Sequence, residues 1–320
     1  MTTEVFISGT SGVLGIETLM HLRERTSLTL MGLSRRAPPI FRPDLPNTQV
    51  DSVFDATWMT DADQNATIVH YAGLANPRAQ FDSIEDLFKR EISPQIHMVE
   101  RLLDRGWRGH LIYVSSGGAV YGDVDTLPIS EDHPPSPKSF YALQKLNVEN
   151  ALQFLANQFK FRLTILRVAN PYGSHIPKPG QGVIPILLNA ATTGTEFTII
   201  GSGEELRDYV YISDLCRAIE TLCLEPLPSD INTINIGSGI GTSLNQLIDI
   251  VVSLTGSTLN IRRSCTRFDV KSNVLDVSRA KNLLNWTPRI GIREGVASMV
   301  ADVAALRSGL NAKDGTFGTP

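Results

Sequence analysis

The sequence has little of what marks a secreted, membrane-bound or nucleic-acid-binding protein. Its 320 residues include only three cysteines, with no Cys-x-x-Cys pair, which excludes a disulfide framework and favours a reducing, cytoplasmic setting. No apolar run approaches the roughly 18 residues of a membrane-spanning helix, and the first residues do not have the pattern of a signal peptide. The net charge of −4 gives no general attraction to nucleic acid or to an anionic membrane, so neither partner is expected.

Regular spacing of metal ligands is also missing. The six histidines show no such spacing, so His70 and His97 are expected to have packing or helix-surface roles, and no metal site is predicted. Hydrophobic residues make up 42% and charged residues 19% of the chain, as in an ordinary soluble globular protein. A chain of this length can form one large domain or two unequal lobes.

Short apolar segments alternate with amphipathic ones over the first half of the chain. Strands are predicted at 5–7, 28–33, 66–71, 110–114 and 163–166, and long helices at 84–103 and 141–159. This alternation indicates right-handed βαβ units and a parallel sheet covered on both faces, which is the doubly wound α/β class. After Asn170 the prolines and glycines of residues 171–182 predict a long loop that borders a site.

A glycine-rich motif follows the first predicted strand. In the segment Gly9-Thr-Ser-Gly12-Val-Leu-Gly15 the glycines permit a tight turn, close approach of the backbone to a pyrophosphate, and packing of helix on strand. A helix that begins here directs its free backbone N–H groups toward the phosphates. Strand, motif and helix together predict a dinucleotide site at the N-terminus.

The end of the second predicted strand indicates which dinucleotide binds. An NAD-selective site has an acidic residue about 20 residues beyond the glycine motif, but here the strand ends in Ser34-Arg35-Arg36. A hydroxyl and two guanidinium groups suit a 2′-phosphate. NADP is therefore predicted over NAD, and the alternative is that both arginines are solvated loop residues.

A tyrosine and a lysine stand four residues apart in the predicted helix 141–159. At this spacing Tyr141 and Lys145 share one helix face. A free phenol has a pKa of about 10, and a nearby ammonium together with a positively charged nicotinamide stabilises the phenolate. A shift to about 7 needs roughly 4 kcal/mol of differential stabilisation. The pair is therefore predicted to act as an acid–base group beside a hydride carrier.

Seven motifs occur in order along the chain: GTSGVLG at 9–15, HYAG at 70–73, SSGGAVYG at 115–122, YALQK at 141–145, RVANPYG at 167–173, GSG with RDYVYISD at 201–214, and NIGSG at 235–239. In this order they resemble the extended short-chain dehydrogenase/reductase family, in its nucleotide-sugar epimerase/dehydratase branch of UDP-glucose 4-epimerase-like proteins.

The resemblance implies a domain organisation and partners. It implies a Rossmann-type NAD(P)-binding domain at 1–170, with a returning segment near 206–238, and a smaller C-terminal α/β lobe at 171–308 for a nucleoside-diphosphate sugar. A flexible tail is expected at 309–320. Members of the family commonly dimerise, so a homodimer through the helices near 84–103 and 141–159 is expected.

The resemblance also implies roles for individual residues. In this interpretation Lys145 binds the nicotinamide ribose and Tyr141 exchanges a proton with a sugar hydroxyl, while Asn170, Arg207 and Arg267 contact the diphosphate. The expected cofactor-binding residues are Gly9, Ser11, Gly12, Val13, Leu14, Gly15, Ser34, Arg35, Arg36, Asp51, Tyr71, Ala72, Gly73, Tyr141 and Lys145. The expected substrate-binding residues are Ser116, Asn170, Arg207, Arg267 and Asn273.

The chain departs from the family pattern at two positions. The family has Ser or Thr four residues before the tyrosine of the Val-Tyr-Gly motif, but here that residue is Gly117. We predict that Ser116 supplies the missing hydroxyl, as the third catalytic residue beside Tyr141 and Lys145. An asparagine of the long central helix is replaced by Glu91.

The motifs also narrow the reaction. The acidic pair of the 4,6-dehydratases is replaced by Gly118-Ala119, which argues against dehydration and against the decarboxylase branch. An NAD(P)-dependent nucleotide-sugar 4-epimerase is the main interpretation, and an NADPH-dependent reductase of a nucleotide-linked 4-keto sugar is the alternative. A non-catalytic NADP-binding regulator is a second alternative. Asn273, smaller than the tyrosine found in some relatives, leaves room for an N-acetylhexosamine.

Overall fold

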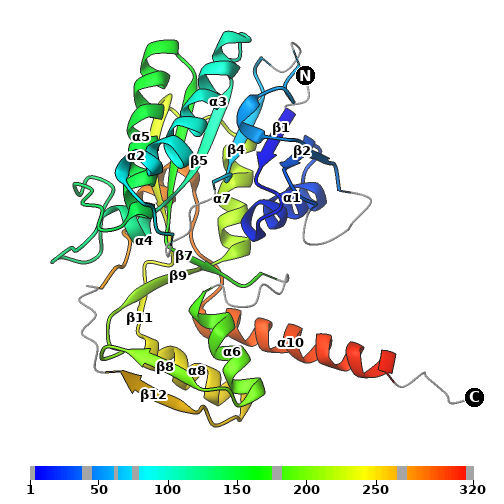
Figure 1. Ribbon diagram of the computed structural model, residues 1–320, viewed down its shortest axis with the longest axis vertical. Helices are drawn as coiled ribbons and strands as arrows, with labels where there is room; N and C mark the ends of the chain where they lie inside the picture. The colour runs from blue at the N-terminus through cyan, green and yellow to red at the C-terminus, as the bar shows by residue number, and fades with distance from the viewer. Residues whose placement is uncertain are drawn as a thin grey trace, which may run out of the picture.

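The computed structural model describes residues 4–37, 45–60, 64–73, 79–174, 182–264 and 272–314. Most of the chain forms a layered α/β body with a smaller lobe below it in the view of Figure 1. The main sheet has seven parallel strands in the order β10-β6-β5-β4-β1-β2-β3. These strands are β1 (Glu4–Ser8), β2 (Thr29–Ser34), β3 (Asn47–Gln49), β4 (Thr67–His70), β5 (His110–Ser116), β6 (Arg162–Val168) and β10 (Ile231–Ile236). The predicted doubly wound, Rossmann-type fold is confirmed.

Helices cover both faces of this sheet, and the alternation along β1 shows how. Val5 and Ile7 belong to a core that includes Ile16 of α1 (Val13–Arg25) and Leu215 of α7 (Ile212–Leu224). Phe6, between them, belongs to a second core on the other face. That core is closed by α3 (Ser93–Asp104) and α5 (Phe140–Phe159), which lie side by side in Figure 1. Successive side chains of β1 point to opposite faces of the sheet, so the strand lies between two apolar layers.

The predicted helix 84–103 is divided into three pieces. It begins as α2 (Ile84–Leu87), continues as a π-helical turn, η3 (Phe88–Ile92), and ends as α3. Pro94 is the second residue of α3, which directly follows the π-helical turn. Glu91 belongs to the π-helical turn, and its side chain is buried in the interior.

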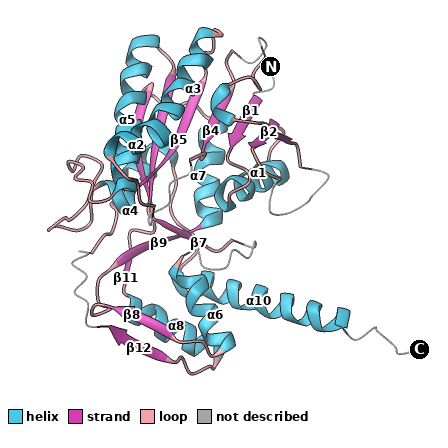
Figure 2. Cartoon of the chain, viewed as in Figure 1, coloured by secondary structure: helices cyan, strands magenta, loops and turns pink. Residues whose placement is uncertain are grey.

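In the described part of the chain, a second lobe contains two small sheets and three helices, seen below the main body in Figure 2. One sheet has the order β11-β9-β7 and the other pairs β12 with β8. The core of this lobe includes Leu187, Leu247, Val251 and Val296. Its elements are β7 (Asn170–Tyr172), α6 (Val183–Thr193), β8 (Phe197–Ile200), β9 (Arg207–Tyr211), β11 (Gly241–Thr242), α8 (Leu244–Thr255), β12 (Ile261–Ser264) and α10 (Ile292–Asp314).

The chain passes between the two lobes more than once. After β9, helix α7 packs against α1, where His21 Nε2 lies 2.8 Å from Glu220 Oε2. Strand β10 then joins the main sheet beside β6. The short helices η1 (Val53–Asp55), α4 (Gly117–Val120) and α9 (Ser278–Leu284) complete the described elements.

The boundary at residue 170 stays a prediction. Helix α10 includes residues 309–314, where a tail was expected, and 315–320 lie outside the described residues.

Candidate functional site

The glycine motif forms a tight loop between β1 and α1. Gly9 has a φ of +88°, which favours glycine, and its carbonyl accepts a hydrogen bond of 2.9 Å from the Gly12 N–H. A Cβ at Gly15 would lie only 2.5 Å from the Gly9 oxygen, so this close approach of loop and helix requires glycine. Helix α1 has no side-chain N-cap and no acidic residue in its first turn. Its first N–H groups are therefore suited to an anion such as a pyrophosphate.

The other residues of the motif differ in exposure. Ser11 is exposed, whereas Gly12, Val13 and Leu14 are half-buried. The segment after β4 lies against this loop, since a Cβ at Gly9 would be 3.1 Å from the Ala72 N atom. The shape of the loop and its open helix end fit a dinucleotide, so the cofactor expected from the sequence has residues that can hold it.

The turn after β2 presents two arginines but not the serine. Ser34 is 1% exposed. Its hydroxyl donates to the Arg36 carbonyl at 2.8 Å and accepts from the Asn47 side-chain amide at 3.3 Å. Arg35, Arg36 and Asp51 are exposed. Ser34 therefore closes the turn, and the guanidinium groups remain as the groups that can meet a 2′-phosphate.

The residues after β4 have distinct orientations. The Tyr71 hydroxyl lies 2.7 Å from Thr18 Oγ1 on α1, and burial raises the Tyr71 pKa well above its usual value. Ala72 donates its N–H to Ser8 Oγ at 3.4 Å. Gly73 is exposed. The Tyr71 ring therefore anchors this segment to α1, while Ala72 and Gly73 border the open end of the sheet.

Tyr141 and Lys145 lie on the first two turns of α5. The helix begins after Ser139, whose side chain accepts from the Ala142 N–H at 3.1 Å. Lys145 is 8% exposed, and its Nζ donates to the Val114 carbonyl at 2.9 Å. The same Nζ lies 6.0 Å from the centre of the Tyr141 ring. The two side chains therefore share one face, next to the end of β5, as the spacing indicates.

The pKa of Tyr141 in the protein alone is set by burial, and the lower pKa expected beside a positively charged nicotinamide stays a prediction. Burial raises the pKa of Tyr141 above 10, and a hydrogen bond from Ser116 lowers it in part. Burial lowers the pKa of Lys145 to about 8, while the carboxylates of Glu149 and Glu91 act to raise it. Spacing along a helix shows which residues share a face, but not how far that face is removed from water, and burial dominates here.

Ser116, predicted to supply the hydroxyl missing at position 117, lies within hydrogen-bonding reach of Tyr141. Ser116 is hydrogen-bonded to Tyr141 and ends β5. A Cβ at Gly117 would lie 2.6 Å from Leu275 Cδ1 and 2.9 Å from the Arg167 carbonyl. A side chain at position 117 therefore has no room in this loop, and the glycine lets it lie against residue 275.

Beneath these residues lies a buried ion pair that the sequence analysis did not identify. Glu149, one helical turn after Lys145, is fully buried and accepts a hydrogen bond from Ser115 Oγ. Arg167 donates to Glu149 Oε2 from Nε at 3.1 Å and from Nη2 at 2.7 Å. The Arg167 guanidinium also lies 4.9 Å from the centre of the Tyr121 ring. The i, i+4, i+8 spacing of 141, 145 and 149 is the signal that could have found Glu149.

Three of the expected substrate residues lie where the small lobe meets the loop after β5, at Gly117 and Gly118, here called the catalytic loop. Asn170 Nδ2 donates to the Asp208 carbonyl at 2.8 Å. Arg207 is half-buried at the start of β9 and donates to the Leu206 carbonyl at 2.8 Å. Asn273 is 4% exposed and donates from Nδ2 to the Gly117 carbonyl at 3.2 Å. Asn273 therefore ties the small lobe to the catalytic loop. Arg267 lies outside the described residues.

Asp208 holds this junction together. Its carboxylate accepts from Ser238 N and Oγ, both at 2.7 Å, from Gly239 N at 3.1 Å and from Leu275 N at 3.2 Å. Burial raises the Asp208 pKa, and these hydrogen bonds act against the rise. The Asp208 N–H also donates to the Asn273 carbonyl at 3.0 Å, so the side chain and backbone of Asp208 together fix the segment that carries Asn273.

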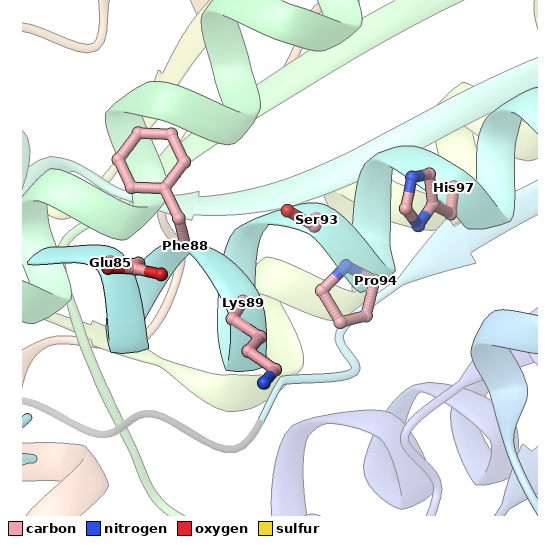
Figure 3. Close-up of a pocket in the computed structure, with 6 residues that line it drawn as sticks. All are labelled: Glu85, Phe88, Lys89, Ser93, Pro94 and His97. Atoms are coloured by element: carbon pink, nitrogen blue, oxygen red, sulfur yellow. The ribbon is translucent and has the colours of Figure 1, made fainter.

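A surface hollow of about 450 Å³ lies away from these residues. Figure 3 shows its side chains on the outer side of α2, η3 and α3. Neither Tyr141 nor Lys145 lines it. Its lining residues are Glu85, Phe88, Lys89, Ser93, Pro94 and His97.

Among the described residues, no helix combines the length and apolar character needed to cross a membrane. The described part of the chain also has no group of three or more histidine, cysteine, aspartate or glutamate residues arranged to hold a metal ion.

Comparisons with known proteins agree with this architecture. Residues 5–237 match the model of the NAD dependent epimerase/dehydratase family. A dTDP-4-dehydro-6-deoxyglucose reductase of Escherichia coli is 32% identical over 74% of this chain and 74% of its own length. A putative UDP-glucose 4-epimerase of Methanocaldococcus jannaschii is 33% identical over 59% of this chain and 61% of its own. The structure of a UDP-glucose 4-epimerase of Thermotoga maritima with UDP-glucose has a TM-score of 0.84 at 27% identity, covering 95% of this chain and 100% of that one.

Proposed function

The chain belongs to the NAD dependent epimerase/dehydratase family, and on that basis we propose that it is a nucleotide-sugar 4-epimerase. The enzyme oxidises the carbinol at C4 of a nucleoside-diphosphate sugar and reduces the resulting ketone from the opposite face. The observation that carries the proposal is the grouping of Tyr141, Lys145 and Ser116 at the end of β5. The open end of α1 at the glycine loop supports it.

Each of the three side chains has a task in this chemistry. A bound nicotinamide supplies acceptance and return of the hydride. Tyr141 accepts the proton of the C4 hydroxyl when the carbinol is oxidised and returns a proton when the ketone is reduced. Burial raises the pKa of Tyr141 in the protein alone, and the positive charges of Lys145 and an oxidised nicotinamide would act against that rise. Lys145, held by the Val114 carbonyl, places a positive charge behind the phenol and binds the nicotinamide ribose. Ser116 donates a hydrogen bond that stabilises negative charge on the reacting oxygen.

The test is a turnover screen with UDP-glucose and UDP-N-acetylglucosamine, in which each 4-epimer is quantified by chromatography. The wild-type protein should form an epimer without net loss of cofactor. Tyr141→Phe should lower turnover by about 10²-fold or more, because the proton exchange is lost. Tyr172→Phe is the matched control, since its hydroxyl bonds the Gly291 carbonyl in the small lobe. Equal turnover of both variants and wild type would exclude Tyr141 as the acid–base group.

A reductase of a 4-keto nucleotide sugar is the second candidate. Two observations favour it: the exposed Arg35 and Arg36 after β2, and the similarity to the Escherichia coli reductase. A reductase draws its hydride from exchangeable NADPH. Stoichiometric oxidation of NADPH with a 4-keto-6-deoxy sugar nucleotide, together with no epimer from either UDP-sugar, would replace the epimerase proposal by this one. A non-catalytic regulator would be favoured only if wild type and Tyr141→Phe were equally inert.

NADP is proposed as the preferred cofactor. The 2′-phosphate would be bound by Arg35 and Arg36, which are exposed beside the buried Ser34. Titration of the protein with NADP and NAD tests this preference, and the double variant R35A/R36A should lose it. Tighter binding of NAD to the wild type would reject the proposal.

Substrate binding is proposed for Asn170, Arg207, Arg267 and Asn273. Arg207 and Arg267 offer the positive charge that a diphosphate needs in an acidic protein. We likewise propose that the substrate carries UDP and that its sugar can carry an N-acetyl group.

A homodimer through α3 and α5 is also proposed. These helices lie together on one face of the main sheet (Figure 1). Ile84 of α2 and Phe154 of α5 are 59% and 67% exposed, and Glu85, which follows Ile84 in the chain, lines the hollow of Figure 3. Exposed apolar side chains on adjacent helices are typical of a surface that a partner covers. Light scattering at micromolar protein concentration measures the molar mass in solution, which should be that of two chains.

A further inference from the structure

A buried aspartate joins the segments that carry the expected substrate residues. Asp208 is fully buried on β9, which lies with β7 between the main body and the small lobe in Figure 1. Its Oδ1 accepts hydrogen bonds from the Ser238 N–H and hydroxyl, both at 2.7 Å. Its Oδ2 accepts from the N–H groups of Gly239 at 3.1 Å and of Leu275 at 3.2 Å. The carboxylate therefore ties β9 to the loop after β10 and to the segment 273–275.

The backbone of the same residue holds two of the expected substrate residues. The Asp208 carbonyl accepts from Asn170 Nδ2 at 2.8 Å, and the Asp208 N–H donates to the Asn273 carbonyl at 3.0 Å. An amide NH2 group has two donors, so this bond orients the Asn170 side chain while the second N–H can meet a phosphate oxygen. Arg207 precedes Asp208 in β9 and forms a β-bridge with Asn273. Three of the expected substrate residues are therefore bonded to Asp208 or next to it in the chain.

The surroundings of this side chain fit a carboxylate and not an amide. Each oxygen of Asp208 accepts two hydrogen bonds, and a Cβ on Gly237 would lie only 2.4 Å from Oδ2. An asparagine would turn its NH2 group either toward the Ser238 N–H or toward the N–H groups of Gly239 and Leu275. Buried donors that face each other lose their hydrogen bonds. One of the two tied segments would therefore shift away from residue 208.

We propose that Asp208 is a positioning residue for nucleotide binding, because it holds Asn170, Arg207 and Asn273 at the spacing that the diphosphate of the substrate needs. This inference rests on the proposed function, since it takes a nucleoside-diphosphate sugar as the substrate. Asp208 is fully buried, so it acts through these neighbours. None of its contacts named above involves the glycine loop of residues 9–15, so the affinity for the dinucleotide should not depend on Asp208.

The experiment measures binding without chemistry. Isothermal titration calorimetry of the full-length protein gives the dissociation constants of UDP, dTDP and GDP, and separately those of NADP and NAD. In Asp208→Asn the dissociation constant of the nucleoside diphosphate that the wild type binds most tightly should rise by about tenfold, equivalent to about 1.4 kcal/mol. The dissociation constant of the preferred dinucleotide should remain that of the wild type.

Asp214→Asn is the matched control. Asp214 is 1% exposed on α7, and its carboxylate also accepts backbone N–H groups, those of Arg289 at 2.9 Å and Ile290 at 3.0 Å. These partners are not among the expected substrate residues. Both variants should therefore lose stability, which thermal unfolding measures, but only Asp208→Asn should lose affinity for the nucleoside diphosphate.

The inference is overturned if folded Asp208→Asn keeps the wild-type affinity for the nucleoside diphosphate, weakens this ligand and the dinucleotide equally, or is matched by Asp214→Asn. Should Asp208→Asn not fold, Ser238→Ala replaces it, because it removes only the hydroxyl bond to Oδ1. Its dissociation constant for the nucleoside diphosphate should rise by about threefold, and an unchanged value would overturn the inference. A wild-type protein that binds none of the three nucleoside diphosphates would overturn the proposed function too, whereas wild-type binding with unchanged affinity in the variant would overturn this inference alone.

Discussion

At the scale of single residues, two adjacent serines have different surroundings. Ser115 is buried and its hydroxyl donates to Glu149. Ser116 is half-buried and its hydroxyl is bonded to Tyr141. Successive residues of a strand point to opposite faces, so one hydroxyl serves the interior and the other serves the site.

The first prediction follows from this difference. Ser116→Ala should lower turnover by about 10²-fold, because the donor to the reacting oxygen is lost, and should leave the free energy of unfolding nearly unchanged. Steady-state kinetics and urea unfolding measure the two effects. Ser115→Ala is the control and should show the opposite pattern, with a loss of stability of about 1–3 kcal/mol from an unsatisfied buried group. Unaltered turnover in Ser116→Ala would remove this residue from the catalytic set.

At the scale of elements, α5 connects the site to the core. Tyr141, Lys145 and Glu149 occupy three successive turns of one face, so the helix carries a phenol, an ammonium and a buried carboxylate in line. Glu149 in turn holds Arg167 of β6. Removal of one partner of this pair would leave the other as an uncompensated charge in the interior, next to Lys145.

The second prediction concerns this ion pair. Glu149→Gln should lower the free energy of unfolding by about 3–5 kcal/mol, because Arg167 would remain buried without its counter-charge. Urea unfolding at neutral pH measures the loss. Glu100→Gln, which removes an exposed carboxylate from α3, should change stability by less than about 1 kcal/mol. Similar values for the two variants would contradict the role given to the pair.

The helix at 84–103 shows what periodicity can and cannot predict. Apolar residues at helical spacing correctly predicted a helix over this range, but its π-helical turn at Phe88–Ile92 has no distinct pattern in the sequence. That turn gives Glu91 its buried position. The burial of Glu91 could therefore not be predicted from its place in the motif order.

At the scale of the whole molecule, two buried histidines link folding to pH. His70 and His110 are 1% and 3% exposed, and burial lowers the pKa of each to about 3. The unfolded chain takes up these protons near pH 6.5 and the folded protein does not. The contribution of these two histidines to the free energy of unfolding is therefore complete above about pH 6.5 and is lost as the pH falls toward 3.

The third prediction is the size of this effect. When the pH falls from 7 to 5, each histidine should lower the free energy of unfolding by about 2 kcal/mol. His110→Gln, which can keep a hydrogen bond to Thr164 Oγ1, should reduce the pH dependence by that amount. Urea unfolding at the two pH values measures it for wild type and variant. Identical pH dependence in the two proteins would contradict the prediction.

Much of this architecture could be predicted because its signals are local. Buried strands are continuous apolar runs, and the glycine motif requires particular backbone geometry, so the main sheet and its loop were predictable. Residues joined only by the tertiary fold were not. Strand β3 is the short polar segment Asn47–Gln49, without an alternating pattern, and Ser34 turns its hydroxyl inward to bond its own turn. The raised pKa of Tyr141 depends on burial that no spacing reports.

The place of β10 decides how this protein can be recombined with others. This strand follows the small-lobe strands β8 and β9 in the chain, yet it covers the edge of β6. A fragment cut after residue 170 would expose the backbone of an apolar strand, which invites aggregation. Transplanting a foreign small lobe therefore requires junctions after β6, before α7 and again after β10, because β11, α8, β12 and α10 of this lobe follow β10 in the chain.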